Sequence, residues 1–187
     1  MACTCSTVFS ILVSVLVFCY IVHSWMGFAP WSKIGSGFKI GPWWHCVRHV
    51  DGSWKCEGIN GDYDDWNKAT AAMMSLASIA IFVALVASCG ICCSCCRNRV
   101  PAIIMVVASG IAAFLVFVAA CIWAANGDKR HGLVDLDYDY GFYVVWILFL
   151  LLLIIPILGG ITIFKRGDLV YYEPRVIAVV GGPGYRA

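Results

Sequence analysis

The decisive stretch of this sequence runs from Gly41 to Cys56 and reads GPWWHCVRHVDGSWKC. Its centre, Val50-Asp51-Gly52, is typical of a three-residue hairpin loop in which glycine takes the left-handed position of a bulge. In that register Cys46 lies directly opposite Cys56, about as close as a disulfide requires. The same register pairs His49 with Ser53, Arg48 with Trp54, and Val47 with Lys55. We therefore predict a Cys46–Cys56 disulfide that staples a hairpin outside the cell; the alternative is two unpaired thiols in an irregular loop.

The composition is that of a membrane protein. Of the 187 residues, 61% are hydrophobic and only 13% are charged, which is too apolar for a soluble domain of this size. The net charge of +2 gives no reason to expect nucleic acid as a partner. We expect a single domain, residues 1–187, that is embedded in the lipid bilayer and has the bilayer as a partner.

Four hydrophobic runs predict four membrane-spanning helices, because each run is long enough to cross a hydrocarbon core about 30 Å thick. None carries Lys, Arg, Asp or Glu in its interior. The first run has a second interpretation, a cleaved signal peptide, although no basic residue precedes it. In the last run, Pro156 and the pair Gly159-Gly160 predict a kink or a close helix contact. The predicted spans are residues 8–27, 69–91, 101–125 and 141–164.

Two polar loops and a tail separate and follow these runs. We expect the loops, residues 28–68 and 126–140, outside the cell, and the tail, residues 165–187, in the cytosol after Lys165 and Arg166 end the last helix. Alternation around Trp31 to Ile40 and in the hairpin predicts a small antiparallel sheet. The basic residues favour this orientation only weakly. A disulfide belongs in an oxidising compartment and free cysteines in a reducing one, which makes both termini cytosolic.

No catalytic, cofactor or metal site is predicted. His45, His49 and His131 lack a nucleophile with supporting groups at a recognisable spacing, and we interpret them as solvent-facing loop residues. The spans lack the ionisable groups that transporters and ion channels use at mid-membrane. We therefore expect neither an enzyme nor a path through the middle of the bundle.

The cluster Cys92-Cys93-Ser94-Cys95-Cys96 lies at the expected cytosolic end of the second helix, beside Arg97 and Arg99. Cys92, Cys93, Cys95 and Cys96 in this position are typical of reversible palmitoylation, which Cys3 and Cys5 also suit. Two alternatives remain open. The thiols are unmodified and pack against neighbours, or they bind a metal such as zinc, for which no histidine lies nearby.

A signature runs through the first loop: Trp31, then G-x-W-x-x-C at Gly41, Trp43 and Cys46, then Cys56. This pattern resembles the claudin superfamily, which includes claudins, peripheral myelin protein relatives and calcium-channel γ subunits. Residues of the third and fourth helices extend the likeness over nearly the whole chain, which most resembles an invertebrate claudin-like protein. The resemblance implies an all-α four-helix membrane bundle with a small extracellular antiparallel β-sheet.

The chain departs from this family in three places. Ala71 or Ala72 stands where claudins usually have an Arg at the start of the second helix, and Lys68 is the nearest basic residue. Pro42 stands where the signature has Leu, so the apolar wedge that Leu gives is either missing or supplied by Trp44. The sequence ends Tyr185-Arg186-Ala187 and not with the Tyr-Val that binds PDZ scaffolds, which argues against a PDZ partner.

The resemblance implies a plasma-membrane protein of cell junctions that forms or regulates a paracellular barrier or pore and associates with copies of itself in cis and in trans. In claudins, side chains after the second Cys line the pore. Carboxylates there favour cations, and the matching candidates are Glu57, Asp62, Asp64 and Asp65. A solvated loop face is the alternative. Contact candidates are Leu133, Leu136 and Tyr138, with Phe28, Trp31, Trp54 and Trp66 in the first loop.

Two further functions fit the same family: an auxiliary subunit of a larger membrane channel or receptor, and a myelin-type adhesion or membrane-organising protein. The short tail and the lack of an N-x-S/T glycosylation motif favour the claudin-like role.

Overall fold

Four long helices form the body of the molecule. The computed structural model describes residues 7–58, 65–93, 100–127 and 137–171. The helices are α1 (Thr7–Met26), α2 (Asp65–Cys93), α3 (Val100–Gly127) and α4 (Tyr140–Tyr171). By length and composition, all 4 are able to cross a membrane, as the sequence predicts.

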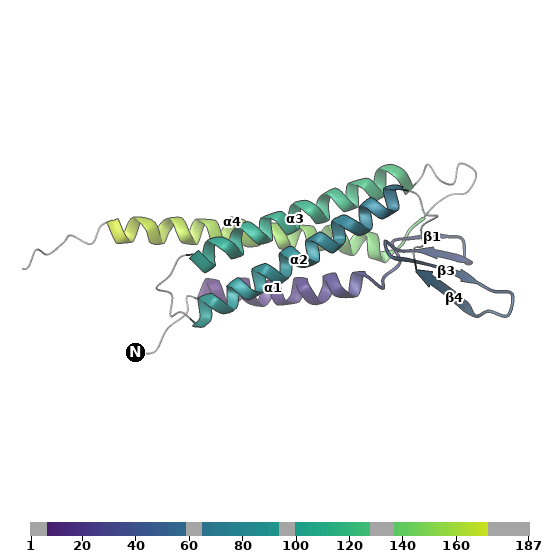
Figure 1. The fold of residues 1–187 in the computed structure, drawn as a ribbon, viewed down its shortest axis with the longest axis horizontal. Helices are drawn as coiled ribbons and strands as arrows, with labels where there is room; N and C mark the ends of the chain where they lie inside the picture. The colour runs from purple at the N-terminus through teal and green to yellow at the C-terminus, as the bar shows by residue number, and fades with distance from the viewer. Residues whose placement is uncertain (1–6, 59–64, 94–99, 128–136, 172–187) are drawn as a thin grey trace, which may run out of the picture.

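The helices run side by side and carry a small sheet at one end (Figure 1). The beginning of α1 and the end of α4 lie at the opposite end of the bundle. The interior of the bundle is packed with buried apolar side chains, many of them alanines that let helix backbones approach closely. Among these are Ala77 and Ala84 of α2 and Ala112, Ala119 and Ala120 of α3.

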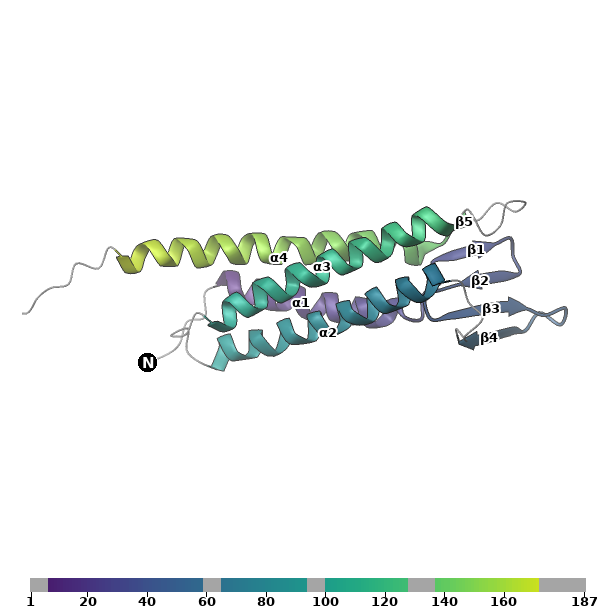
Figure 2. The same cartoon turned by 45° about the horizontal axis from the view of Figure 1, so that its top comes forward.

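The sheet has five strands in the order β4-β3-β2-β1-β5 (Figure 2). Four of them come from the first predicted loop, which confirms the small antiparallel sheet. The fifth comes from the second predicted loop, where no strand was expected, because a two-residue strand leaves no alternation to read. The strands are β1 (Ser32–Ile34), β2 (Phe38–Ile40), β3 (Trp44–Arg48), β4 (Trp54–Gly58) and β5 (Asp137–Tyr138).

The β3–β4 hairpin has the predicted register. Cys46 pairs with Cys56, and the pairing continues through Arg48 and Trp54 to the loop. Gly52 has a φ of 84°, the left-handed conformation that the loop requires of a glycine. In the same loop, the Asp51 carboxylate accepts hydrogen bonds from the Ser53 hydroxyl (2.7 Å) and amide (2.9 Å), which lower the pKa of Asp51.

Two helix boundaries differ from the predicted ones. Helix α2 begins at Asp65, before the apolar run. Helix α4 continues past Lys165 and Arg166 to Tyr171, so the expectation that these basic residues end it is wrong. Lys and Arg are good helix formers, and their long side chains let a helix continue into the polar layer. The rest of the tail lies outside the described residues.

The close helix contact predicted near the end of α4 is confirmed. Helix α4 continues through Pro156. A Cβ atom on Gly159 would lie 2.7 Å from the Val106 side chain of α3, so glycine makes room for that side chain. This part of α4 therefore packs closely on α3.

Candidate functional site

The candidate site is the end of the molecule where the sheet meets the helices. Its covalent feature is the predicted disulfide, which joins Cys46 of β3 to Cys56 of β4 and is confirmed. Cys46 is buried and Cys56 is exposed. The bond therefore joins the inner strand β3 to the exposed edge strand β4.

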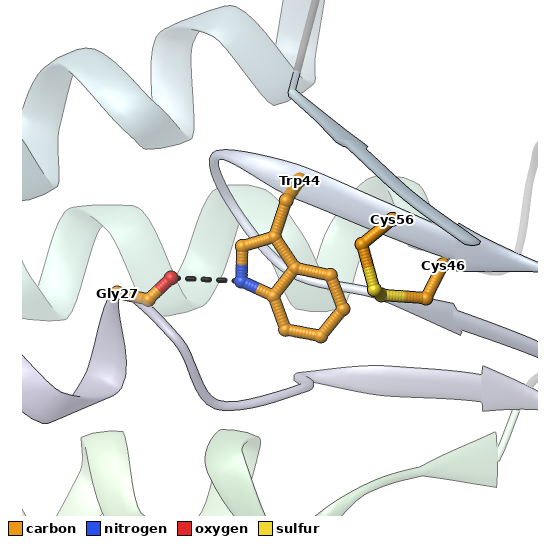
Figure 3. The surroundings of a disulfide bond; sticks show 4 residues. All are labelled: Gly27, Trp44, Cys46 and Cys56. Carbon is orange, nitrogen blue, oxygen red and sulfur yellow. Dashed lines mark hydrogen bonds between the residues drawn. A yellow bond between two sulfur atoms is a disulfide. The ribbon is translucent and has the colours of Figure 1, made fainter. Parts of the chain in front are cut away.

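Trp44 ties the hairpin to the end of α1. Its indole N–H donates a hydrogen bond of 2.8 Å to the Gly27 carbonyl oxygen, and its ring lies between this helix end and the disulfide (Figure 3). A Cβ atom on Gly41 would lie 3.1 Å from the same ring, so a glycine at this position leaves room for it. The Trp44 ring thus packs within the chain, and its replacement of the missing Leu wedge stays a prediction.

A cluster of three tryptophans anchors the beginning of the sheet to the helices. Trp31 and Trp66 both pack against Trp123 of α3, with ring centroids 5.2 and 5.3 Å away. The Trp123 indole N–H donates a hydrogen bond of 2.9 Å to the hydroxyl of Ser32 in β1. Trp31 is fully buried and Trp66 half-buried, so these two contact candidates contribute to the core of the site.

We expect a Trp123→Phe variant to lose about 1 to 2 kcal/mol of unfolding free energy, because the buried Ser32 hydroxyl loses its donor while most of the ring packing stays. Thermal unfolding in detergent micelles measures this. The half-exposed Trp25 provides a control, since Trp25→Phe should change the stability by less than about 0.5 kcal/mol. Equal losses in both variants would contradict the role of the hydrogen bond.

The start of α4 is bound to the beginning of the sheet. The Asp139 amide donates to the Trp31 carbonyl oxygen (2.9 Å), and the Gly141 amide donates to that of Pro30 (3.1 Å). Tyr138 stacks on Phe142 with ring centroids 4.2 Å apart and is half-buried. Much of the Tyr138 side chain therefore packs against its own chain and is not free to contact another molecule. The other two contact candidates of this loop, Leu133 and Leu136, lie outside the described residues.

One face of the sheet, called here the disulfide face, is basic. Residues directly opposite one another share a face, and the register aligns Asp137, Lys33, Lys39, Cys46 and Cys56 in one row, so that a carboxylate at the β5 edge faces the first of the lysines. Arg48 joins this face two residues after Cys46. The Lys39 ammonium lies 5.0 Å from the centre of the Trp54 ring, which is a cation–π contact. The strands thus bring three cations together in a place that the sequence pattern alone does not reveal.

Glu57, the first pore-lining candidate, lies on the opposite face of the sheet. Its carboxylate accepts a hydrogen bond from the Lys55 ammonium at 2.8 Å, and the side chains of both residues are exposed (48% and 65%). This hydrogen bond, together with the charge of Lys55, lowers the pKa of Glu57. Glu57 therefore stays ionised at neutral pH, although its charge is partly offset by its neighbour.

The other acidic candidates are not brought next to Glu57 by the described structure. Asp65 is the first residue of α2 and lies 3.8 Å from the Lys68 ammonium. Asp62 and Asp64 lie outside the described residues. Pore lining by these four residues therefore stays a prediction.

Removing Lys55 should change the titration of Glu57. In a Lys55→Met variant we expect the pKa of Glu57 to rise, because the carboxylate loses both the hydrogen bond and the nearby positive charge. Carboxyl chemical shifts followed by NMR over a pH titration measure this change. Lys68→Met, which removes a lysine elsewhere, serves as the control, and an unchanged pKa in Lys55→Met would show that the pair is not formed in solution.

The described part of the cysteine cluster, Cys92 and Cys93, lies far from the sheet. Cys92 and Cys93 are the last residues of α2, at the end of the bundle opposite the sheet (Figure 1). Cys95 and Cys96 lie outside the described residues, as do Cys3 and Cys5. Within the described ranges, no group of at least 3 His, Cys, Asp or Glu side chains is placed to hold a metal ion. Palmitoylation stays a prediction.

Sequence reasoning missed one polar residue inside a span. His23 of α1 is buried, and its Nε2 lies 2.7 Å from the Ser78 hydroxyl and 3.1 Å from the Met74 carbonyl oxygen, both on α2. Its hydrogen bonds join α1 to α2 near the sheet. The signal was present, because His23 is the one histidine within a predicted span.

No protein-family model matches this chain, and a search of curated proteins found no match either. The architecture, with four apolar helices and a small sheet closed by one disulfide, fits a claudin-like membrane fold.

Proposed function

We propose that this chain is a claudin-like junction protein of the plasma membrane that forms or regulates a paracellular barrier or pore. The observation that carries the proposal is the sheet at one end of four apolar helices, with two of its strands joined by Cys46–Cys56 and with Trp44 and Trp123 bound to it and to the helix ends. A structure of this kind is suited to meet other proteins beside the bilayer.

The disulfide supports an orientation with the sheet outside the cell, because such bonds persist in oxidising compartments. The beginning of α1 and the end of α4 lie at the other end of the bundle, so both termini are then cytosolic. The cysteine cluster at the end of α2 lies on this same side, where acylating enzymes act.

The exposed edge of the sheet is the surface that supports association with further copies. All residues of β4 are exposed, and β4 is an outermost strand of the sheet. Such edges can pair with a strand of another molecule. Trp54, Val50 at the hairpin tip and Phe28 after α1 add exposed apolar surface of the kind that protein interfaces bury.

We also propose that the pore prefers cations. The basic residues near the candidate carboxylates limit how strong this preference can be. Lys55 partly offsets Glu57, and the disulfide face carries Lys33, Lys39 and Arg48. An excess of negative charge along the pore therefore depends on Asp62 and Asp64 as well as on Glu57. Carboxylates in a narrow passage attract cations because they are poorly screened there.

A Glu57→Lys variant should shift the ion preference toward anions, because the change replaces a negative charge by a positive one beside Lys55. Dilution potentials across epithelial layers that express either form measure the preference. Asp51→Lys at the exposed hairpin loop makes the same change of charge away from Glu57 and is the matched control. If Glu57→Lys leaves the potentials unchanged, pore lining by Glu57 is wrong.

Expression of the chain alone in fibroblasts that lack junctions tests the function itself. We expect continuous strands at cell contacts in freeze-fracture or fluorescence images. Copurification with a channel or receptor in the absence of strands would favour an auxiliary subunit. Close membrane apposition without strands would favour a myelin-type adhesion protein.

A further inference from the structure

A small groove lies where the disulfide face meets the ends of two helices. Its volume is about 240 Å³, and Phe28 and Pro30 line it from the α1 side, with Tyr140 at the start of α4. Its other wall is formed by Trp44, Trp54, Lys39 and the Cys46–Cys56 disulfide. The groove is therefore aromatic, with one ammonium group and a covalently fixed wall.

The groove lies beside the ends of two candidate membrane spans. Phe28 follows the apolar span that ends at Met26, and Tyr140 begins the span that ends at Phe164. Trp25 stacks on Tyr140 with ring centroids 5.8 Å apart, and both rings are substantially exposed, as is Phe28 (79%). Exposed aromatic residues at helix ends are typical of the membrane–water interface.

Among the described residues that line this groove, Lys39 carries the only charged side chain. Its ammonium is held 5.0 Å from the centre of the Trp54 ring. The ion pairs within the described ranges use Lys55 and Lys68. The nearby Asp139 carboxylate instead accepts a hydrogen bond of 2.8 Å from the Tyr140 amide, at the start of α4.

From this arrangement we propose that the groove binds the phosphate group of a phospholipid in the leaflet next to the sheet. The Lys39 ammonium pairs with the phosphate, which is the anion that a bilayer presents at this level. The rings of Phe28, Trp44 and Tyr140 pack against the glycerol region and the upper part of the chains. This proposal requires only that the helices span a membrane, and it is independent of any junctional role.

The test uses the full chain purified in a maltoside detergent, which contains no phosphorus. Diheptanoylphosphatidylcholine is titrated in, and native mass spectrometry counts the lipid molecules bound to each chain. We expect saturable binding of one lipid, weakened about tenfold or more in Lys39→Gln, because a charge-assisted contact is lost. Lys39→Arg keeps the charge and should bind within about threefold of the unaltered chain.

Lys33→Gln is the control for the same change of charge, because Lys33 lies directly opposite Lys39 on the same face but does not line the groove; on its other side Lys33 faces Asp137 of β5. We expect it to bind the lipid like the unaltered chain. An intact Cys46–Cys56 bond and an unchanged unfolding temperature would show that each variant is folded.

Three outcomes would overturn the proposal. Lys39→Gln could bind the lipid as tightly as the unaltered chain. Lys39→Gln and Lys33→Gln could weaken binding equally, which would indicate a diffuse attraction to a basic surface. Finally, inorganic phosphate could displace the bound lipid fully at a concentration equal to that of the lipid, which would indicate a site for free phosphate.

Discussion

A Gly141→Ala variant should lose about 3 kcal/mol of unfolding free energy, near the upper end of the range for overpacked positions. A Cβ atom at this position would overlap the Pro30 carbonyl oxygen and would lie 2.9 Å from the Pro30 carbonyl carbon and 3.1 Å from the Trp31 ring. The obstacle is backbone, which cannot move away as a flexible side chain does. Either the start of α4 shifts or the hydrogen bond between Gly141 and Pro30 breaks.

The measurement is thermal unfolding in detergent micelles, with delivery to the cell surface as a second readout. Gly160→Ala in the same helix is the control, because a Cβ atom there would meet nothing within 4 Å. It should be neutral or slightly stabilising, since alanine favours helix more than glycine does, by about 1 kcal/mol. Similar stability for Gly141→Ala and Gly160→Ala would show that α4 and the loop before β1 are not in close contact.

A Cys46→Ser, Cys56→Ser double variant should lose about 2 to 3 kcal/mol, as expected for a disulfide that closes a short loop; the two cysteines are separated by 10 residues. We expect the loss to be concentrated in the β3–β4 hairpin. The rest of the sheet keeps its bonds to the helices through Ser32 and Trp123. Helical circular dichroism should therefore change little, while the hairpin amides exchange faster with solvent.

Hydrogen exchange followed by mass spectrometry measures the hairpin and the helices separately. Cys89→Ser removes an exposed free thiol of α2 and is the matched control, for which we expect no change in the hairpin. If the double variant protects its hairpin amides as well as the unaltered chain does, then Trp44 and the strand pairing suffice to hold the hairpin.

Much of the fold could be predicted from local patterns. The apolar runs are long enough to define the four spans, and the hairpin follows from Val50-Asp51-Gly52 together with the spacing of Cys46 and Cys56. These features depend on residues near one another in the chain. The end of α4 could not be predicted from Lys165 and Arg166, because basic residues stop a membrane span without stopping a helix.

The features that were missed depend on contacts between distant segments. Strand β5 exists because Tyr138 pairs with Ser32, not because its own two residues favour a strand. His23 meets Ser78 only once α1 and α2 have packed. The groove beside Lys39 combines residues of β2, β3 and β4 with the ends of α1 and α4. The Lys55–Glu57 pair was also missed, although it depends only on neighbouring residues. Two residues at alternate positions of one strand share a face, so this pair could have been predicted from the sequence.

The joining of β5 to β1 has a consequence for biogenesis. Tyr138 and Gly141 reach the ribosome exit long after Ser32 and Pro30, with two helices made between them, yet these segments are hydrogen-bonded or paired in the finished protein. The sheet therefore remains incomplete until β5, which follows three of the four helices, has been made. A chain truncated before β5 would leave the outer edge of β1 without its partner strand, and such open edges promote pairing with other chains.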